Sequence, residues 1–420
     1  MITEFGNQIA LYDLTRPFVW IYKSSDATNL VYVIQKLNPL NVYVNVSGEL
    51  RQPKEFGSAD TFMINPSEIL ADEIDTQIRA KNESTPRIEF SGYVQFRLLL
   101  TEEVEMPNGT LQYITNQSMW FTSQVAYGID AATQHEETFG LNQATWFDMY
   151  RVTPASSNSN RAKWVTNKPL NNTTNSVDDN EYIYTFVQQK KCKVHISIET
   201  ISASIYTFST AYLLYGLNSV GIGVPNIIDA IGQSDWDTIS STAYRVRYVV
   251  KSFTGVEVSE KGSYVIDKEK CTTERLRVYW KNRKGGVDGY TFNSELQVST
   301  NNKKKLSKRP LGYRRSNSEN INSMGYLVNN TYGSDTRVVA STQMKANETI
   351  SVTSKFHTTE QLTWLSEITT SPQIWIENTR TGNLNAVYSA TSKMDTKPKG
   401  KSLGQMKLSL VMSNEILTQR

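Results

Sequence analysis

Apolar and polar residues alternate with a period of two along much of the chain, which is the pattern of strands that bury one face. The clearest case is residues 275–292, RLRVYWKNRKGGVDGYTF, where two alternating runs flank a glycine-rich centre. Gly285-Gly286 and Asp288-Gly289 tolerate the backbone conformations of a sharp turn. The segment therefore predicts a hairpin of two half-buried strands with aromatic walls and a basic, glycine-rich tip.

Similar runs predict strands through the rest of the sequence, whereas helix signals are rare. Residues 87–125 predict a long hairpin that turns at Pro107-Asn108-Gly109. Helix starts are expected at Asn65-Pro66 and at Thr358, where capping residues precede an apolar stripe. Further strands are expected at 18–22, 30–34, 42–46, 182–187, 194–198, 206–215, 244–250, 336–341, 349–353, 373–376 and 406–412. We predict a mainly β fold of two or three antiparallel β-sandwich domains with a few short helices.

A chain of 420 residues exceeds what one apolar core supports, so several domains are expected. The stretch 153–180 is rich in Ser, Asn and Thr and poor in apolar residues, which predicts a linker or a long surface loop. It would separate an N-terminal β domain at 1–152 from a second β region at 181–265. A C-terminal β-sandwich domain would follow at 266–420.

Composition and the cysteines restrict the class of protein. Hydrophobic residues make up 39% of the chain, which allows several cores, but no apolar run approaches the ~20 residues of a membrane helix. The first residues lack the basic and apolar regions of a secretory signal, so we expect no membrane contact and a reducing compartment. Cys192 and Cys271 are too far apart for a metal knuckle. Free thiols are expected, with a single disulfide as the alternative.

Positive charge gathers in one part of the sequence. The formal net charge is +3, but residues 275–315 hold twelve Lys/Arg and two acids, which gives +10 there and leaves −7 for the rest. The polar, basic stretch 301–322 is predicted to be a loop between strands. It could contact an acidic neighbouring subunit or DNA phosphates, and a solvated loop is the remaining alternative. The candidate interface residues are Trp280, Arg283, Lys284, Asp288, Tyr290, Lys303, Lys304, Lys305, Lys308, Arg309, Arg314 and Arg315.

Residue types that carry catalysis or metal binding do not gather at a familiar spacing. The three histidines form no metal-ligand pair, and no phosphate loop or nucleophile elbow is present. Asp235 and Asp237 flank a tryptophan and could suit a glycosidase cleft, although such pairs are also common in solvated turns. Asp288 is expected to form the hairpin turn, because one acid is too few for a calcium loop. We predict no catalytic residue, no metal and no cofactor.

The run from Trp280 to Phe292 has the form W-x-N-R-x-G-G-x-D-x-Y-x-F. With the basic loop, the short helix at 362–368 and the terminal strand, it resembles structural proteins of tailed bacteriophages that infect Bacteroidetes, including the crAss-like group. Tail and head-to-tail ring components of these phages look similar in this hairpin. The early strands at 32–49 and the Asn65–Leu70 segment resemble the N-terminal part of such proteins, whereas residues 181–260 resemble none of them.

The resemblance implies a non-enzymatic virion protein, a ring or collar subunit of the portal–tail connection that assembles in the cytoplasm of the bacterial host. Its partners would be identical subunits, the portal and other tail proteins, joined through β-domain edges and loops. The 275–315 segment would meet an acidic neighbour or line a DNA channel, with exposed Trp280 and Tyr290 in the contact. One alternative is a carbohydrate- or receptor-binding β-sandwich module of a phage tail or surface adhesin. The other is a tail hydrolase that uses Asp235 and Asp237.

Overall fold

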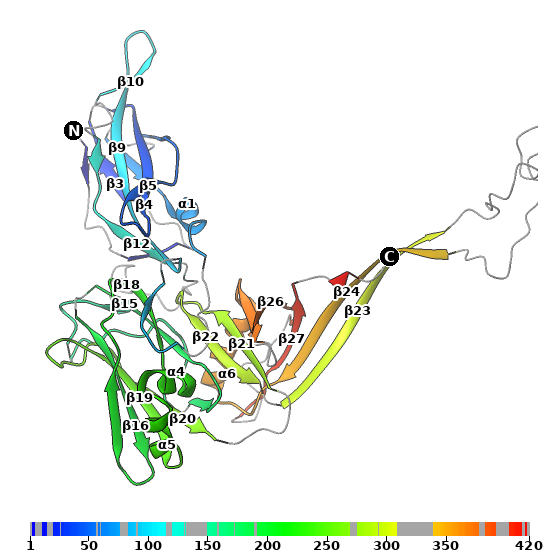
Figure 1. The fold of residues 1–420 in the computed structure, drawn as a ribbon. Coiled ribbons are helices and arrows are strands. Elements are labelled where there is room, and N and C mark those ends of the chain that lie inside the picture. The colour runs from blue at the N-terminus through cyan, green and yellow to red at the C-terminus, as the bar shows by residue number, and fades with distance from the viewer. Residues whose placement is uncertain are drawn as a thin grey trace, which may run out of the picture.

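Strands are the main secondary structure of the protein in a computed structural model (Figure 1). Five sheets and four helices lie within the residues that the structure describes. The predicted fold class, mainly β with antiparallel β-sandwich domains and a few short helices, is confirmed. The described residues are 2–4, 11–14, 20–25, 27–55, 58, 60–75, 83–89, 91–114, 120–129, 131, 149–157, 159–171, 173–188, 191–268, 275–292, 294–308, 339–377, 383–391, 403–413 and 416–417.

Two sheets share a core in the N-terminal part, at the top of Figure 1. The Trp20 and Phe96 rings stack in this core with 5.4 Å between centroids. The helix α1 (Ser67–Ala71) lies where the sequence predicts it, and the Ser67 N–H donates to Asn65 Oδ1 at its start. The strands are β1 (Thr3–Glu4), β3 (Trp20–Lys23) and β7 (Thr61–Ile64) in one sheet, and β2 (Leu11–Asp13), β4 (Asn29–Leu37), β5 (Tyr43–Asn45), β6 (Leu50–Pro53), β9 (Tyr93–Glu105), β10 (Leu111–Tyr113), β11 (Phe121–Thr122) and β12 (Ala126–Ile129) in the other.

The middle part contains two further sheets and a helix pair, drawn mostly in green in Figure 1. The strand expected at 206–215 is shorter and ends at Ser209. The helices α4 (Val224–Ile231) and α5 (Gln233–Ser240) were not predicted, and both contribute side chains to the core of this part. The strands are β8 (Arg87–Ile88), β13 (Arg151–Val152), β15 (Tyr182–Val187) and β18 (Gly216–Gly221) in one sheet, and β14 (Thr173–Ser176), β16 (Lys193–Thr200), β17 (Ile205–Ser209), β19 (Ala243–Lys251) and β20 (Gly262–Asp267) in the other.

One eight-stranded sheet forms the C-terminal part, and the helix α6 (Thr359–Thr370) packs on it through Leu362, Leu365 and Ile368. Thr358 caps this helix, as its sequence predicts, because its hydroxyl accepts from the Gln361 N–H. The strands, in sheet order, are β22 (Val287–Phe292), β21 (Leu276–Lys281), β25 (Ile374–Glu377), β26 (Leu384–Ser389), β27 (Lys407–Met412), β24 (Val339–Thr353) and β23 (Ser294–Lys308), with β28 (Ile416–Leu417) beside β24.

The prediction of a loop at 301–322 is wrong for residues 301–308, which are the part of this stretch that the structure describes. Residues 301–308 continue β23, which pairs with β24 from Ser294 to Lys308. Pairing with a partner strand overrides the weak strand propensity of the Asn and Lys residues there. We call residues 301–308 and 339–347 the arm, which extends away from the rest of the sheet in Figure 1.

The predicted linker at 153–180 is instead packed into the fold. Trp164 and Val165 are each 1% exposed, and β14 pairs in parallel with β20. An additional apolar core contains Tyr93, Phe186 and Tyr279, which belong to the N-terminal, middle and C-terminal parts respectively. The three parts are therefore joined by buried side chains and not only by the chain itself.

Candidate functional site

The β21–β22 hairpin is buried on both faces, so the expected half-burial is wrong. Every residue of β21 is buried. Its apolar face, which includes Trp280, belongs to the core under α6, and the Trp280 and Trp364 rings lie 5.2 Å apart. Its other face turns toward the middle part, where Tyr279 joins the shared core. The hairpin and α6 together contact residues 164–181 of the middle part. We call this contact the seam.

The hairpin turn is confirmed, and it is built around one asparagine. Asn282 Oδ1 accepts from the backbone N–H groups of Lys284 and Gly286, at 2.9 and 3.1 Å. Its amide nitrogen donates to the Val165 carbonyl at 3.0 Å, across the seam. Gly285 has a φ of 91°, which glycine adopts without strain. The turn therefore needs both its asparagine and its glycines to enter the seam.

Asp288 lies at the centre of the seam and is 3% exposed. Its carboxylate accepts from the Thr166 hydroxyl, the Trp364 indole N–H and the Asn282 amide, at 2.8, 2.8 and 3.0 Å. Burial raises the pKa of Asp288, and these donors offset part of the rise. The expectation that Asp288 forms the turn is wrong, because Asp288 lies in β22 and pairs with Trp280. It is a buried acceptor that connects β22 with α6 and with the middle part.

A buried ionic network crosses the seam beside Asp288. Arg277 is 5% exposed and contacts Asp179 at 3.2 Å and Glu181 at 2.7 Å. Lys168 contacts the other oxygen of Glu181 at 2.6 Å. Burial raises the pKa of Glu181, but Lys168 and Arg277 outweigh it and hold that pKa below its usual value. Charges from both parts therefore neutralise each other in the interior.

Glu367 of α6 is a second buried acid in the seam, 3% exposed. Its carboxylate accepts from the Asn167 amide at 2.6 Å and from the Arg283 N–H at 3.3 Å. Burial and then the charge of Asp288 raise the pKa of Glu367 to about 7. This acid is therefore partly protonated near neutral pH.

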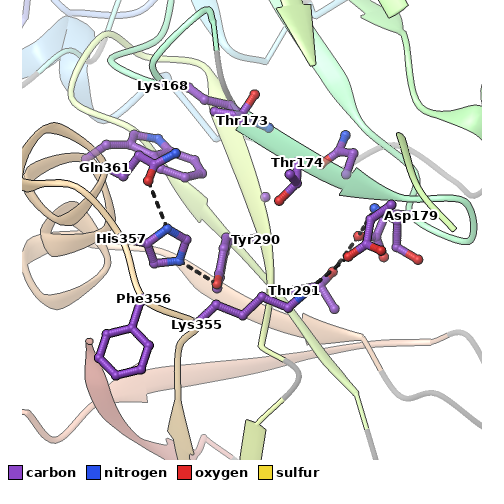
Figure 2. A pocket seen from close by; sticks show the side chains of 15 residues that line it. Lys168, Thr173, Thr174, Asp179, Tyr290, Thr291, Lys355, Phe356, His357 and Gln361 are labelled. Carbon is purple, nitrogen blue, oxygen red and sulfur yellow. Dashed lines mark hydrogen bonds and ion pairs between the residues drawn. The ribbon is translucent and has the colours of Figure 1, made fainter. Parts of the chain in front are cut away.

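A pocket of about 300 Å³ opens at the edge of the seam (Figure 2). Figure 2 shows His357 between Gln361 and Tyr290, at 3.1 and 2.7 Å. Because an amide oxygen only accepts, His357 Nδ1 donates to Gln361 and Nε2 accepts from the Tyr290 hydroxyl. Burial lowers the pKa of His357, which favours this neutral form. Lys355 at the pocket wall contacts Asp267 of β20 at 2.9 Å.

The predicted interface residues do not form one exposed surface. The expectation of exposed aromatic anchors is wrong for Trp280, which is fully buried, and Tyr290 is only partly exposed. Lys284 is 2% exposed and lies 5.2 Å from the Tyr150 ring, and Arg283 is half-buried beside Glu367. The structure places Lys303, Lys304, Lys305 and Lys308 in β23. Arg309, Arg314 and Arg315 lie outside the described residues.

Asp235 and Asp237 do not converge on a shared cleft. Both are exposed on α5, where residues two apart point about 200° from each other. Asp235 accepts from the Tyr206 hydroxyl at 3.3 Å, and Asp237 accepts from the Gln233 amide at 2.7 Å. This geometry does not suit the acid pair of a glycosidase.

Other candidate chemistry is sparse in the described part of the chain. Within it, no group of three or more His, Cys, Asp or Glu could hold a metal ion, and no helix has the length and apolarity needed to span a membrane. Cys192 is a free, buried thiol, and burial raises its pKa to about 11. Cys271 lies outside the described residues.

The seam residues on the middle side were missed at the sequence level, since Lys168, Asp179 and Glu181 fall in or beside a stretch that looks like a linker. The isolated Trp164 in that stretch, and the acids at 178–181 opposite a basic hairpin, were the available signals. No protein-family model and no curated protein matches this chain. The groups of the seam indicate what it does: buried, paired charges hold two β domains in one orientation.

Gly286→Ala tests how closely the hairpin fits the seam. A Cβ at Gly286 would lie 2.6 Å from the Val165 carbonyl oxygen, so we expect the free energy of unfolding to fall by about 2 kcal/mol or more. Urea unfolding measures it. Gly48→Ala is the matched control, because no atom lies within 4 Å of its Cβ position. An equal loss of stability in the two variants would contradict a close fit of Gly286 against Val165.

Glu367→Gln tests the second buried acid. A pKa raised from 4.5 to about 7 stabilises the folded state fully below pH ~4.5, and this contribution is lost as pH rises through ~7. The stability of the wild type relative to Glu367→Gln should therefore fall by about 3 kcal/mol from pH 4.5 to 8.

Denaturant unfolding at several pH values measures this difference, in which the titrations of other groups cancel. Glu360→Gln, at an exposed position of the same helix, is the control and should give no such slope. A pH-independent difference between wild type and Glu367→Gln would contradict the raised pKa.

Proposed function

We propose that the chain is a non-enzymatic virion structural protein, a ring or collar subunit of the portal–tail connection of a tailed bacteriophage. It would assemble in the cytoplasm of the bacterial host with identical subunits, the portal and other tail proteins. The observation that carries this proposal is the arm. A long strand pair that leaves its own sheet is suited to reach a neighbouring subunit.

The arm offers an open sheet edge. β23 is the last strand in the order β22-β21-β25-β26-β27-β24-β23, so its outer edge has no partner strand among the described residues. Unpaired backbone groups along such an edge bind another chain readily. Identical subunits that each present an arm to the next form a head-to-tail contact, and a head-to-tail contact closes into a ring when the rotation fits.

The seam supports the same proposal in a second way. A ring closes only if each subunit presents its two contact surfaces at the same angle. The contacts of Arg277 and Asp288 with the middle part fix the angle between two β domains. The run from Trp280 to Phe292, which carries the resemblance to phage ring components, supplies the hairpin of this joint.

Shortening the arm tests the proposal. Lys304 and Met344 are register partners, so an Asn-Gly turn can replace residues 305–343 and leave the base of the hairpin paired. We expect the wild type to form oligomers alone or with candidate portal and tail proteins, and the shortened chain to stay monomeric at an unchanged melting temperature. Mass photometry measures the species.

Unchanged assembly of the shortened chain would show that the arm is not the contact. A wild type that stays monomeric with every candidate partner would contradict the proposed function itself.

The carbohydrate- or receptor-binding alternative has one observation in its favour. Phe356 is 65% exposed at the wall of the pocket, beside polar groups that could bind hydroxyls. An aromatic surface next to such groups is the usual arrangement for a sugar ring. The paired charges of the pocket leave few groups free for an ionic ligand.

Phe356→Ala tests this alternative on a glycan array. If the pocket binds sugar, the monomeric wild type gives a signal that Phe356→Ala reduces by about tenfold, since one aromatic stacking contact is lost. Phe253→Ala is the matched control, because Phe253 is 69% exposed but does not line the pocket. No signal from the wild type, or equal signals from both variants, would contradict sugar binding in the pocket.

A further inference from the structure

Lys168 and Asn175 of the middle part meet at the buried carboxylate of Glu181. The Lys168 ammonium donates to Glu181 Oε1 at 2.6 Å, and the Asn175 amide donates to Glu181 Oε2 at 3.3 Å. Because one carboxylate accepts from both groups at once, it brings the two side chains together. A primary amine and a carboxamide beside one acid–base group are the components of an amide exchange, in which the amine replaces the amide nitrogen.

Glu181 is held in place by other contacts as well. Its backbone N–H donates to Asn226 Oδ1 at 3.1 Å, and its carbonyl accepts from the Ile222 N–H at 2.8 Å. Arg277 donates to Glu181 Oε2 at 2.7 Å from across the seam. Glu181 is 3% exposed and Asn175 is 5% exposed, so little water competes for the reacting groups. Groups held in such fixed positions react as if their concentrations were very high.

The pocket of Figure 2 connects the reacting groups with solvent. Lys168 and Asn175 both line this pocket, and its volume of about 300 Å³ is ample for a molecule as small as ammonia. The Trp364 ring, also at the pocket wall, lies 5.4 Å from Lys168 Nζ and adds an apolar neighbour. Ammonia released here is diluted into the solvent, which makes the exchange irreversible.

We infer that Lys168 and Asn175 react once in each folded chain and form an amide bond between Lys168 Nζ and Asn175 Cγ. Glu181 takes a proton from the Lys168 ammonium, and the resulting amine attacks Cγ. The new bond from Nζ to Cγ forms, Glu181 passes a proton from Nζ to Nδ2, and the bond from Cγ to Nδ2 breaks. The released ammonia takes up the proton that Glu181 still holds. The exchange consumes no oxidant, reductant or second substrate.

This reaction is slow, but each chain needs it only once. Lys168 and Arg277 hold the pKa of Glu181 below its usual value, so the first proton transfer is uphill. The fixed contact and the loss of ammonia offset this cost. After the charge of Lys168 is lost, Arg277 still pairs with Glu181, and the carboxylate is not left buried without a partner.

The bond anchors the part of the seam that belongs to the middle part. Lys168 directly follows Thr166 and Asn167, which contact Asp288 and α6. Asn175 lies in β14, which pairs with β20. A covalent link between residues 168 and 175 therefore ties the contact residues of the seam to a sheet. This inference goes beyond the proposed function and does not depend on it.

Intact-mass spectrometry of the purified full chain tests the inference. After incubation in the folded state, the wild type should be lighter than its sequence by the mass of one ammonia. Lys168→Arg keeps a charge beside Glu181 but removes the amine, so it should have its full mass, as should Asn175→Ala. Lys355→Arg is the matched control, because it changes another lysine of the same pocket wall and should lose ammonia like the wild type.

Tandem mass spectrometry locates the bond. Trypsin releases residues 164–190 as one peptide, because the lysine at 168 precedes a proline. An amide bond from 168 to 175 closes a ring, so single backbone cleavages between these residues release no fragment. A cyclic imide at Asn175 would also lose ammonia, but it would keep those fragments and open in hydroxylamine, and finding it would overturn the inference.

Other contrary results are equally clear. A wild type of full mass overturns the inference, and so does a loss of ammonia that persists in Lys168→Arg or maps elsewhere in the chain. Circular dichroism shows whether each variant is folded. If a variant does not fold, the wild-type mass and the fragment map still decide. None of these measurements reads assembly, so their failure leaves the proposed function standing.

Discussion

The burial of Arg277 is the constraint on which the arrangement of the domains depends. A guanidinium that leaves water without partners costs several kcal/mol, so Arg277 can be buried only where acids meet it. Those acids, Asp179 and Glu181, lie 98 and 96 residues earlier in the chain and belong to the middle part. The polar face of the β21–β22 hairpin is therefore buried with its charge neutralised only when the middle part packs on it.

This coupling assigns different roles to the two ends of the C-terminal sheet. At the β22 end the hairpin is enclosed, and its polar groups bind other polar groups of the same chain. At the β23 end the sheet extends into a ribbon with an open edge. Lysines on an open edge discourage indiscriminate pairing with other strands, because two such edges repel each other.

Local sequence signals predicted those elements whose cause is local. The alternation in β16 and β19, the turn at Gly285 and the Thr358 cap all follow from neighbouring residues. Burial of the hairpin was not predictable in this way, since alternation shows that two faces differ and not what covers them. The polar face of β21 looks solvated until its partners 96 residues away are known. The strand at 301–308 had the same difficulty, because its cause is the pairing with β24.

Why a structural joint should use buried ions at all is a separate question, since apolar residues of equal volume often give more stability. An apolar contact is non-directional and tolerates small rotations of one surface on the other. A contact in which Arg277, Asp179 and Glu181 must meet at hydrogen-bond distance, while Asp288 accepts from Thr166, tolerates few orientations. In a closed ring any error in the angle of one subunit is repeated in every copy and prevents closure. The proposed role as a ring subunit would require a joint that favours orientation over stability, and the seam has this character.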